Sequence, residues 1–296
     1  MGKVIDWRSK ARVGLIGRLL LVVAIVAFIF GAWAAWNSLD LGANSVNWWL
    51  LLVVGLIGAP ASQFLNAAEY RIMSTSLGTT ASWRSSFLVT VAGSAANQLP
   101  VPGSFLVRTV SLTSRGVSAS RATIMASVTA VLFLGAASTG VAVAALNDRV
   151  ALVMLVALVA AAVCFAGGTL LAVRACAVDL TSVGRLVIVE VGLVIVASLR
   201  AWGFATALDL PGSVVQFVGL SAGAALSTTI GVLPAGIGLT ELLTGGLASL
   251  VGLGASVGLL IAILDRVFRM SFLAVASLAL VLRGGAGLGN VDYPSG

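Results

Sequence analysis

Long apolar runs, each about as long as a membrane crossing, dominate the pattern of hydrophobic and polar positions along this chain. A helix rises about 1.5 Å per residue, so a hydrocarbon core of about 30 Å needs about 20 consecutive residues. Six runs reach that length, and we expect each of them to form a transmembrane helix. They are Leu15–Trp36, Val46–Ala68, Ala122–Leu146, Val150–Val173, Leu186–Ala207 and Ala255–Leu282.

Two further apolar segments are broken by proline and glycine. Ser85–Leu99 is only about 21 Å long as a helix. It runs into Asn97-Gln98-Leu99-Pro100-Val101-Pro102-Gly103, and a second short segment ends at Arg115. Val214–Leu233 meets Pro234-Ala235-Gly236-Ile237-Gly238, and a short segment continues to Val251. Non-helical backbone at membrane depth is tolerated only inside protein or beside a polar cavity. The pattern predicts two re-entrant helical hairpins; the alternative is ordinary crossings, and Val214–Leu233 is long enough to cross by itself.

The basic residues set the expected orientation, because short cytoplasmic loops carry an excess of arginine and lysine. Residues 1–14 form a basic N-terminus that we place in the cytoplasm, and six full spans bring the C-terminus to the same side. Only Arg149 falls in an outer loop. Tryptophan is enriched at membrane interfaces, and most of it here lies at the expected outer ends of the runs. The sequence therefore predicts a multi-pass protein of the inner membrane.

This topology contains an internal relation between two halves. Residues 46–146 and 186–282 each consist of a full span, a hairpin and another full span, and the two hairpins enter from opposite sides. Such an inverted repeat is common in transporters, whose sites lie near mid-membrane where broken helices meet. We expect residues 1–296 to form one all-α membrane domain, with a Gly-rich, disordered tail at 284–296.

Composition excludes several classes of protein. The chain is 59% hydrophobic and 9% charged, with a net charge of +7, whereas soluble domains carry about 25% charged residues. The basic residues are spread singly, without the stripe that a nucleic-acid-binding protein presents. Histidine is absent, and the two cysteines form no metal or redox motif. We therefore expect no nucleic-acid partner, no metal and no cofactor.

Charged residues inside apolar runs are the main candidates for a site, because each costs about 2.5–3.5 kcal/mol at the bilayer centre. Glu241 follows the second break, and Asp265, Arg266 and Arg269 lie near the middle of the last run. Asp265 and Arg269 are four residues apart and can pair, so mutual neutralisation and substrate binding are both open. Arg108 is either a cytoplasmic boundary charge or a phosphate ligand.

Proline and glycine breaks often only kink helices or allow close packing. Because the two breaks lie in corresponding positions, we include them with the charged residues in one candidate substrate-binding set. The set is Asn97, Gln98, Pro102, Gly103, Arg108, Pro234, Gly236, Gly238, Thr240, Glu241, Asp265, Arg266 and Arg269. Arg200 is expected to snorkel to the outer interface, and Glu69 and Arg71 are expected at a membrane boundary.

The motifs at these positions resemble those of a known family. The segment from Asn97 to Gly103, with Arg108 and then Arg115-Gly116-Val117-Ser118, resembles the first signature of the lysylphosphatidylglycerol synthase transmembrane-region family. The segment Leu233–Glu241, followed by Leu264-Asp265-Arg266, resembles its second signature. The resemblance covers roughly Val46 to Leu282. Relatives often carry an acid–arginine pair within Ala122–Leu146, which this chain lacks.

The resemblance implies a stand-alone lipid translocase rather than an enzyme. A phospholipid or polyprenyl-phosphate head group would enter a polar cavity between the hairpins, with Arg108 and helix N-termini holding phosphate. Glu241 and Asp265 would balance a cationic head group or exchange protons with Arg266 and Arg269. The alternatives are a membrane enzyme, or enzyme subunit, that modifies lipids or lipid-linked glycans, and a scaffold of an envelope-synthesis complex. The expected partners are membrane lipids, with a homo-oligomer or an envelope-synthesis protein as further options.

Overall fold

The computed structural model is helical throughout the part of the chain that it describes. The described residues are 30, 33–39, 46–97, 102–147, 150–230 and 238–284, and the side chains of 224, 228–230 and 280–284 are not described. The expected tail at 284–296, apart from its first residue, and most of the first expected span, Leu15–Trp36, lie outside these ranges.

Among the described residues, four helices are long and apolar enough to cross a membrane. They are α2 (Trp48–Ser76), α5 (Ala119–Asn147), α6 (Ala151–Cys176) and α7 (Leu180–Ala207). These helices correspond to four of the predicted spans and confirm that the chain is an α-helical membrane protein. Helix α10 (Ala255–Gly284) is also long, but Asp265, Arg266 and Arg269 interrupt its apolar sequence, and its crossing stays a prediction.

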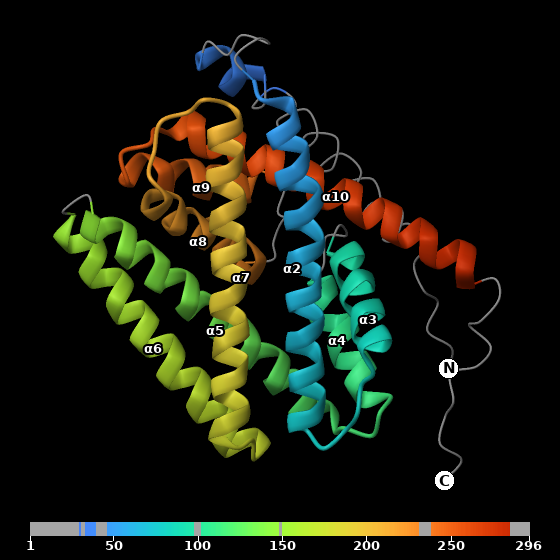
Figure 1. The fold of residues 1–296 in the computed structure, drawn as a ribbon. Helices are drawn as coiled ribbons and strands as arrows, with labels where there is room; N and C mark the ends of the chain where they lie inside the picture. The colour runs from blue at the N-terminus through green and yellow to red at the C-terminus, as the bar shows by residue number, and fades with distance from the viewer. Residues whose placement is uncertain are drawn as a thin grey trace, which may run out of the picture.

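Helices α2 and α7 lie side by side and antiparallel at the centre of the bundle (Figure 1). The backbone N–H of Asn47, just before α2, donates a hydrogen bond of 2.7 Å to the carbonyl of Ala207 at the end of α7. Further along, a Cβ on Gly203 would lie 2.7 Å from a Val54 side-chain carbon. The missing side chain therefore lets the two backbones approach, as small residues do between membrane helices.

Two pairs of short helices lie at opposite ends of this central pair. Helices α3 (Trp83–Ala96) and α4 (Gly103–Thr113) lie toward the lower end in Figure 1, and α8 (Val214–Ile230) and α9 (Leu239–Leu250) toward the upper end. Helix α3 packs on α2 and α4 packs on α5; correspondingly, α8 packs on α7 and α9 on α10. With about 1.5 Å per residue, α3, α4 and α9 are all too short for a full crossing.

Polar caps fix where several of these helices begin. Asn47, Ser82 and Asp179 each accept a hydrogen bond from the backbone N–H three residues later, at the starts of α2, α3 and α7. Such caps satisfy amides that have no partner within the helix. The hydrogen bonds from Ser182 also lower the pKa of the exposed Asp179 carboxyl.

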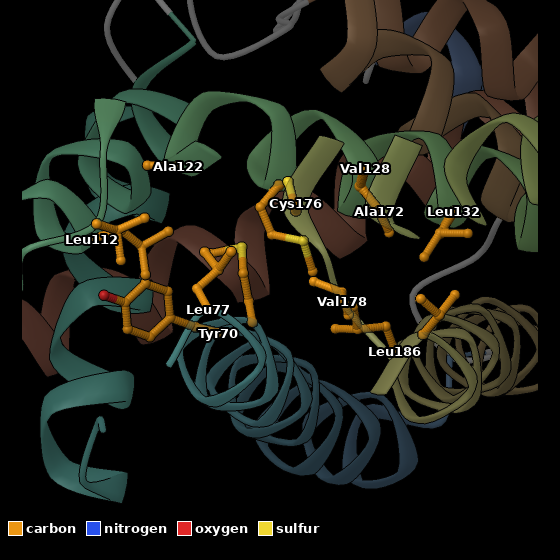
Figure 2. Close-up of a cluster of buried hydrophobic side chains, with 14 of the residues drawn as sticks. Tyr70, Leu77, Leu112, Ala122, Val128, Leu132, Ala172, Cys176, Val178 and Leu186 are labelled. Atoms are coloured by element: carbon orange, nitrogen blue, oxygen red, sulfur yellow. The ribbon is translucent and has the colours of Figure 1, made fainter. Parts of the chain in front are cut away.

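A large apolar cluster joins α2, α4, α5, α6 and α7 at one end of the bundle (Figure 2). Tyr70, Met73, Leu112, Met125 and Leu186 are completely buried in it. The Tyr70 hydroxyl is 2.7 Å from that of Ser111, so the polar tip of this ring has a partner on α4. Because Tyr70 follows Glu69 directly, this packing also fixes the position of the first buried carboxylate.

Candidate functional site

A cavity of about 320 Å³, lined by both polar and apolar side chains, lies between the helices of the bundle. Its walls come from α2, α3, α4, α5, α7, α8, α9 and α10. Six ionisable side chains line it, three of them acidic and three basic. They are Glu69, Arg108, Glu190, Arg200, Asp265 and Arg269. Ionisable groups in a membrane interior are expensive and normally have partners or a function, so we trace the partners of each.

Three of these residues form the Glu190 cluster, namely Glu69 on α2, Arg108 on α4 and Glu190 on α7. Arg108 Nη1 donates to Glu69 Oε1 at 2.5 Å, and Arg108 Nη2 donates to Glu69 Oε2 at 2.8 Å. This forked geometry is the strongest form of an arginine–carboxylate pair. Both oxygens of Glu69 are therefore bound by a single guanidinium, and the negative charge of Glu69 cancels the positive charge of Arg108.

Glu190 is the third member, and it is only 1% exposed. Its carboxyl group faces both Glu69 and Arg108. Glu190 Oε1 has no hydrogen-bond donor among the residues that the structure describes. The cluster therefore contains two carboxylates and one guanidinium, with one buried acceptor unpaired. A buried acceptor without a donor costs free energy, since it has lost its bonds to water.

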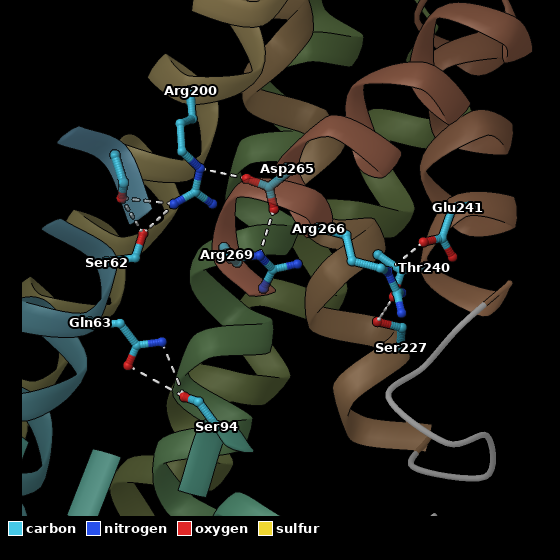
Figure 3. Close-up of polar contacts among 11 residues, drawn as sticks. Ser62, Gln63, Ser94, Arg200, Ser227, Thr240, Glu241, Asp265, Arg266 and Arg269 are labelled. Carbon is cyan, nitrogen blue, oxygen red and sulfur yellow. Dashed lines mark hydrogen bonds and ion pairs between the residues drawn. The ribbon is translucent and has the colours of Figure 1, made fainter. Parts of the chain in front are cut away.

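The other three residues form the Asp265 cluster, namely Arg200 on α7 with Asp265 and Arg269 on α10 (Figure 3). Arg200 Nε donates to Asp265 Oδ1 at 2.5 Å, and Arg269 Nε lies 2.8 Å from Asp265 Oδ2. Arg200 Nη1 also donates to the Ser62 hydroxyl at 2.6 Å and to the Gly58 carbonyl at 2.9 Å. One carboxylate, that of Asp265, thus pairs with two guanidinium groups.

A fourth pair, Glu241 with Arg266, does not line the cavity. Arg266 Nε lies 2.7 Å from Glu241 Oε1, and Glu241 Oε2 accepts the backbone N–H of Gly238 at 2.8 Å. Gly238 has a φ of +85°, a conformation that residues with a Cβ rarely adopt. Glu241 therefore caps α9 and neutralises Arg266, which are structural tasks.

One side-chain hydrogen bond fastens each short-helix pair across its break. The Asn97 side chain accepts the backbone N–H of Ser104 at 2.6 Å, between α3 and α4. The hydroxyls of Thr240 and Ser227 are 2.7 Å apart, between α9 and α8. A Cβ on Gly103 would overlap the backbone of Ala96, so α4 can begin there only with glycine. Asn97 and Thr240 also line the cavity.

The structure brings six of the thirteen predicted site residues together on the cavity wall. They are Asn97, Pro102, Arg108, Thr240, Asp265 and Arg269. Gly103, Gly238, Glu241 and Arg266 lie outside the lining, in the positions given above. Gln98, Pro234 and Gly236 lie outside the described residues. The predicted Asp265–Arg269 pair is confirmed, and Arg108, which is 8% exposed, pairs with Glu69 on the cavity wall.

Three lining residues correct the analysis of the sequence. Arg200 was expected at the interface, but it is 5% exposed and paired with Asp265, so that prediction is wrong. Glu69 was expected at a membrane boundary; it lies inside α2, which continues to Ser76, and it is 3% exposed and paired with Arg108. Glu190 was not among the candidates, although it lies inside the expected run Leu186–Ala207. Helix α7 begins at Leu180, which places Glu190 well inside the helix.

The remaining chemistry of the described residues is sparse. They contain no group of three or more histidine, cysteine, aspartate or glutamate side chains that could hold a metal ion. The cavity therefore presents carboxylates, guanidinium groups, hydroxyls and amides as its binding groups. No protein-family model matches the chain, and no curated protein matches it.

Proposed function

We propose that this chain is a lipid translocase of the inner membrane. It passes the head group of a phospholipid or a polyprenyl phosphate through the polar cavity, while the acyl or prenyl tails remain in the bilayer. The observation that carries the proposal is the position of the cavity. Six charged side chains line a space large enough for a head group, inside a bundle that exposes many large apolar side chains. Pockets of about 300–1,000 Å³ are typical of small-ligand sites.

The arrangement of the helices supports a transporter plan. In our proposal, α3–α4 and α8–α9 are re-entrant hairpins, and residues 46–146 and 186–282 are inverted repeats with both termini in the cytoplasm. The antiparallel α2 and α7, with the short pairs at opposite ends, are what such a repeat requires. The resemblance to the lysylphosphatidylglycerol synthase transmembrane-region family points the same way, and its signatures contain Arg108 and Asp265.

Reconstitution into liposomes tests the proposal. Fluorescent phospholipid or polyprenyl phosphate is distributed over both leaflets, and an impermeant quencher reads the fraction that reaches the outside. Vesicles with the protein should lose inner-leaflet fluorescence, whereas protein-free vesicles should keep it. Ala130 lines the cavity, so Ala130→Trp should fill the space and stop the movement.

A matched control uses the same new side chain on the outer surface. Val163 on α6 is 65% exposed, so Val163→Trp should leave translocation unchanged. Wild-type rates in a folded Ala130→Trp protein, with both lipids, would show that head groups do not pass through this cavity.

A further inference from the structure

The charges on the cavity wall are balanced overall but separated in space. With both of its carboxyl groups ionised, the Glu190 cluster has two carboxylates and one guanidinium, and so a surplus of one negative charge. The Asp265 cluster contains two guanidinium groups and one carboxylate, so its surplus is one positive charge. The Arg266–Glu241 pair is self-neutralised and lies off the cavity. A ligand in the cavity therefore meets a surplus of negative charge at the Glu190 cluster and a surplus of positive charge at the Asp265 cluster.

The hydrogen-bonding groups are divided in the same way. Glu190 Oε1 is an unpartnered acceptor on a side chain that is 1% exposed and lines the cavity. Within the described part of the chain, nothing accepts a hydrogen bond from Arg200 Nη2 or from the terminal nitrogens of Arg269. A guanidinium fork suits phosphate oxygens, and an unpaired carboxylate suits an ammonium group.

The spacing of the clusters limits the ligand further. Ser62, which binds Arg200, and Glu69, which binds Arg108, are seven residues apart on α2. Seven residues make two helical turns, so both side chains leave the same face, about 10 Å apart along the axis. A ligand that meets both surpluses must carry its two charges on one short, polar group.

We propose that the cavity selects a zwitterionic phosphate-containing head group, with its ammonium at Glu190 and its phosphate at Arg200 and Arg269. This inference rests on the proposed function and narrows it to one class of lipid. It reverses two roles that the sequence had indicated. The two terminal nitrogens of Arg108 are taken by Glu69, and both oxygens of Asp265 are taken by arginines, so neither residue is the main ligand-binding group.

Binding measurements with defined probes test the charge arrangement. Dioctanoyl phosphatidylethanolamine carries both charges, and dioctanoyl phosphatidylglycerol carries the phosphate without the ammonium. The purified full-length protein should bind the first at least about tenfold more tightly, because one charge-assisted hydrogen bond corresponds to a factor of that size. Glu190→Gln should abolish this preference. Arg269→Gln should weaken both probes and leave their ratio unchanged.

Two variants serve as controls. Glu241→Gln alters a buried carboxylate away from the cavity and should keep the wild-type preference. Glu190→Asp retains the carboxylate and should keep part of it. Equal affinity of the wild-type protein for the two probes would overturn the proposal, since a proton would then balance Glu190. An unchanged ratio in folded Glu190→Gln would overturn it as well. If that variant does not fold, the wild-type ratio still decides.

A third probe separates this inference from the proposed function. Glycerophosphoethanolamine has the same head group without acyl tails. If it binds with the same dependence on Glu190 and the liposome assay shows no movement of lipid, the charge arrangement stands and the ligand is soluble. If lipids move but the two head groups compete equally, the translocase stands and the zwitterion selectivity fails.

Discussion

The two charge clusters on the cavity wall are built from the same two kinds of side chain in opposite proportions. The Glu190 cluster has one guanidinium between two carboxylates, and the Asp265 cluster has one carboxylate between two guanidinium groups. Their responses to perturbation should differ, because a carboxylate can take up a proton and a guanidinium cannot release one. A surplus of negative charge can thus be relieved without a ligand, whereas a surplus of positive charge requires an anion.

The largest expected effect comes from breaking the Asp265 cluster, whose guanidinium groups cannot lose their charge by releasing a proton. In Asp265→Asn, two buried or half-buried guanidinium groups lose the carboxylate that pairs with both of them. Removing one partner of a buried pair costs about 3–5 kcal/mol. The free energy of unfolding, measured by denaturant titration in mixed micelles, should fall by that amount. Asp209→Asn, the same change at an exposed position, is the control and should be neutral.

The second effect tests whether Glu190 can substitute for Glu69. Glu69→Gln should cost only about 1.5–3 kcal/mol, the value of hydrogen bonds to a charged group, because Arg108 can turn to Glu190. Glu190→Gln removes only the surplus and should be close to neutral. The double variant leaves Arg108 without a carboxylate and should cost about 3–5 kcal/mol.

The energies in this cycle should therefore not add, as is usual for residues that share a partner. Strict additivity, with the double variant no worse than the sum of the single ones, would mean that Glu190 and Glu69 do not share Arg108. The same unfolding titration on all four proteins supplies the comparison.

A smaller effect concerns the serine that positions Arg200. Ser62→Ala deletes the hydrogen bond of 2.6 Å to Arg200 Nη1 and keeps the bond from that nitrogen to the Gly58 carbonyl. The loss should be about 1.5 kcal/mol, the lower end for a bond to a charged group. Phosphate-lipid affinity should fall with it, because Arg200 is less well oriented. Thermal unfolding and lipid binding on one preparation separate the two effects.

The smallest effect compares the two short-helix pairs. Asn97→Ala removes the acceptor of the Ser104 amide at the start of α4 and should cost about 1 kcal/mol, like other lost helix caps. Ser227→Ala, at the corresponding tie between α8 and α9, should cost about as much. If only the first variant is destabilised, the two ties are not equivalent, and the proposed repeat loses support at this point.

The periodic and compositional features of the fold were predictable from the sequence. Four of the expected spans coincide with long apolar helices, and Ser85–Leu99 predicts the short helix Trp83–Ala96 with a three-residue error at its C-terminal end. Such features depend on the length of apolar runs and on proline and glycine, which act within a few residues. The Asp265–Arg269 pair is equally local, since both residues lie on one turn of one helix.

One error in the site comes from a helix end, because the expected end at Ala68 left Glu69 outside its span. Glu190 lay inside its expected run, Leu186–Ala207, and was missed there. Arg200 was assigned to the interface because nothing near it in the sequence indicates a partner. Its carboxylate, Asp265, lies 65 residues further along the chain.

The sequence by itself determined that this is an all-helical membrane protein, which segments are too short to cross, and that the apolar runs contain charges. Only the tertiary structure decided which charges meet. Arg108 lies 39 residues from Glu69, and Arg200 lies 138 residues from Ser62. An apolar run predicts that a segment leaves water for the membrane, because that step depends only on the free energy of transferring the segment's own side chains. Pairing depends on distance and direction between helices, and these arise when α2, α7 and α10 pack together.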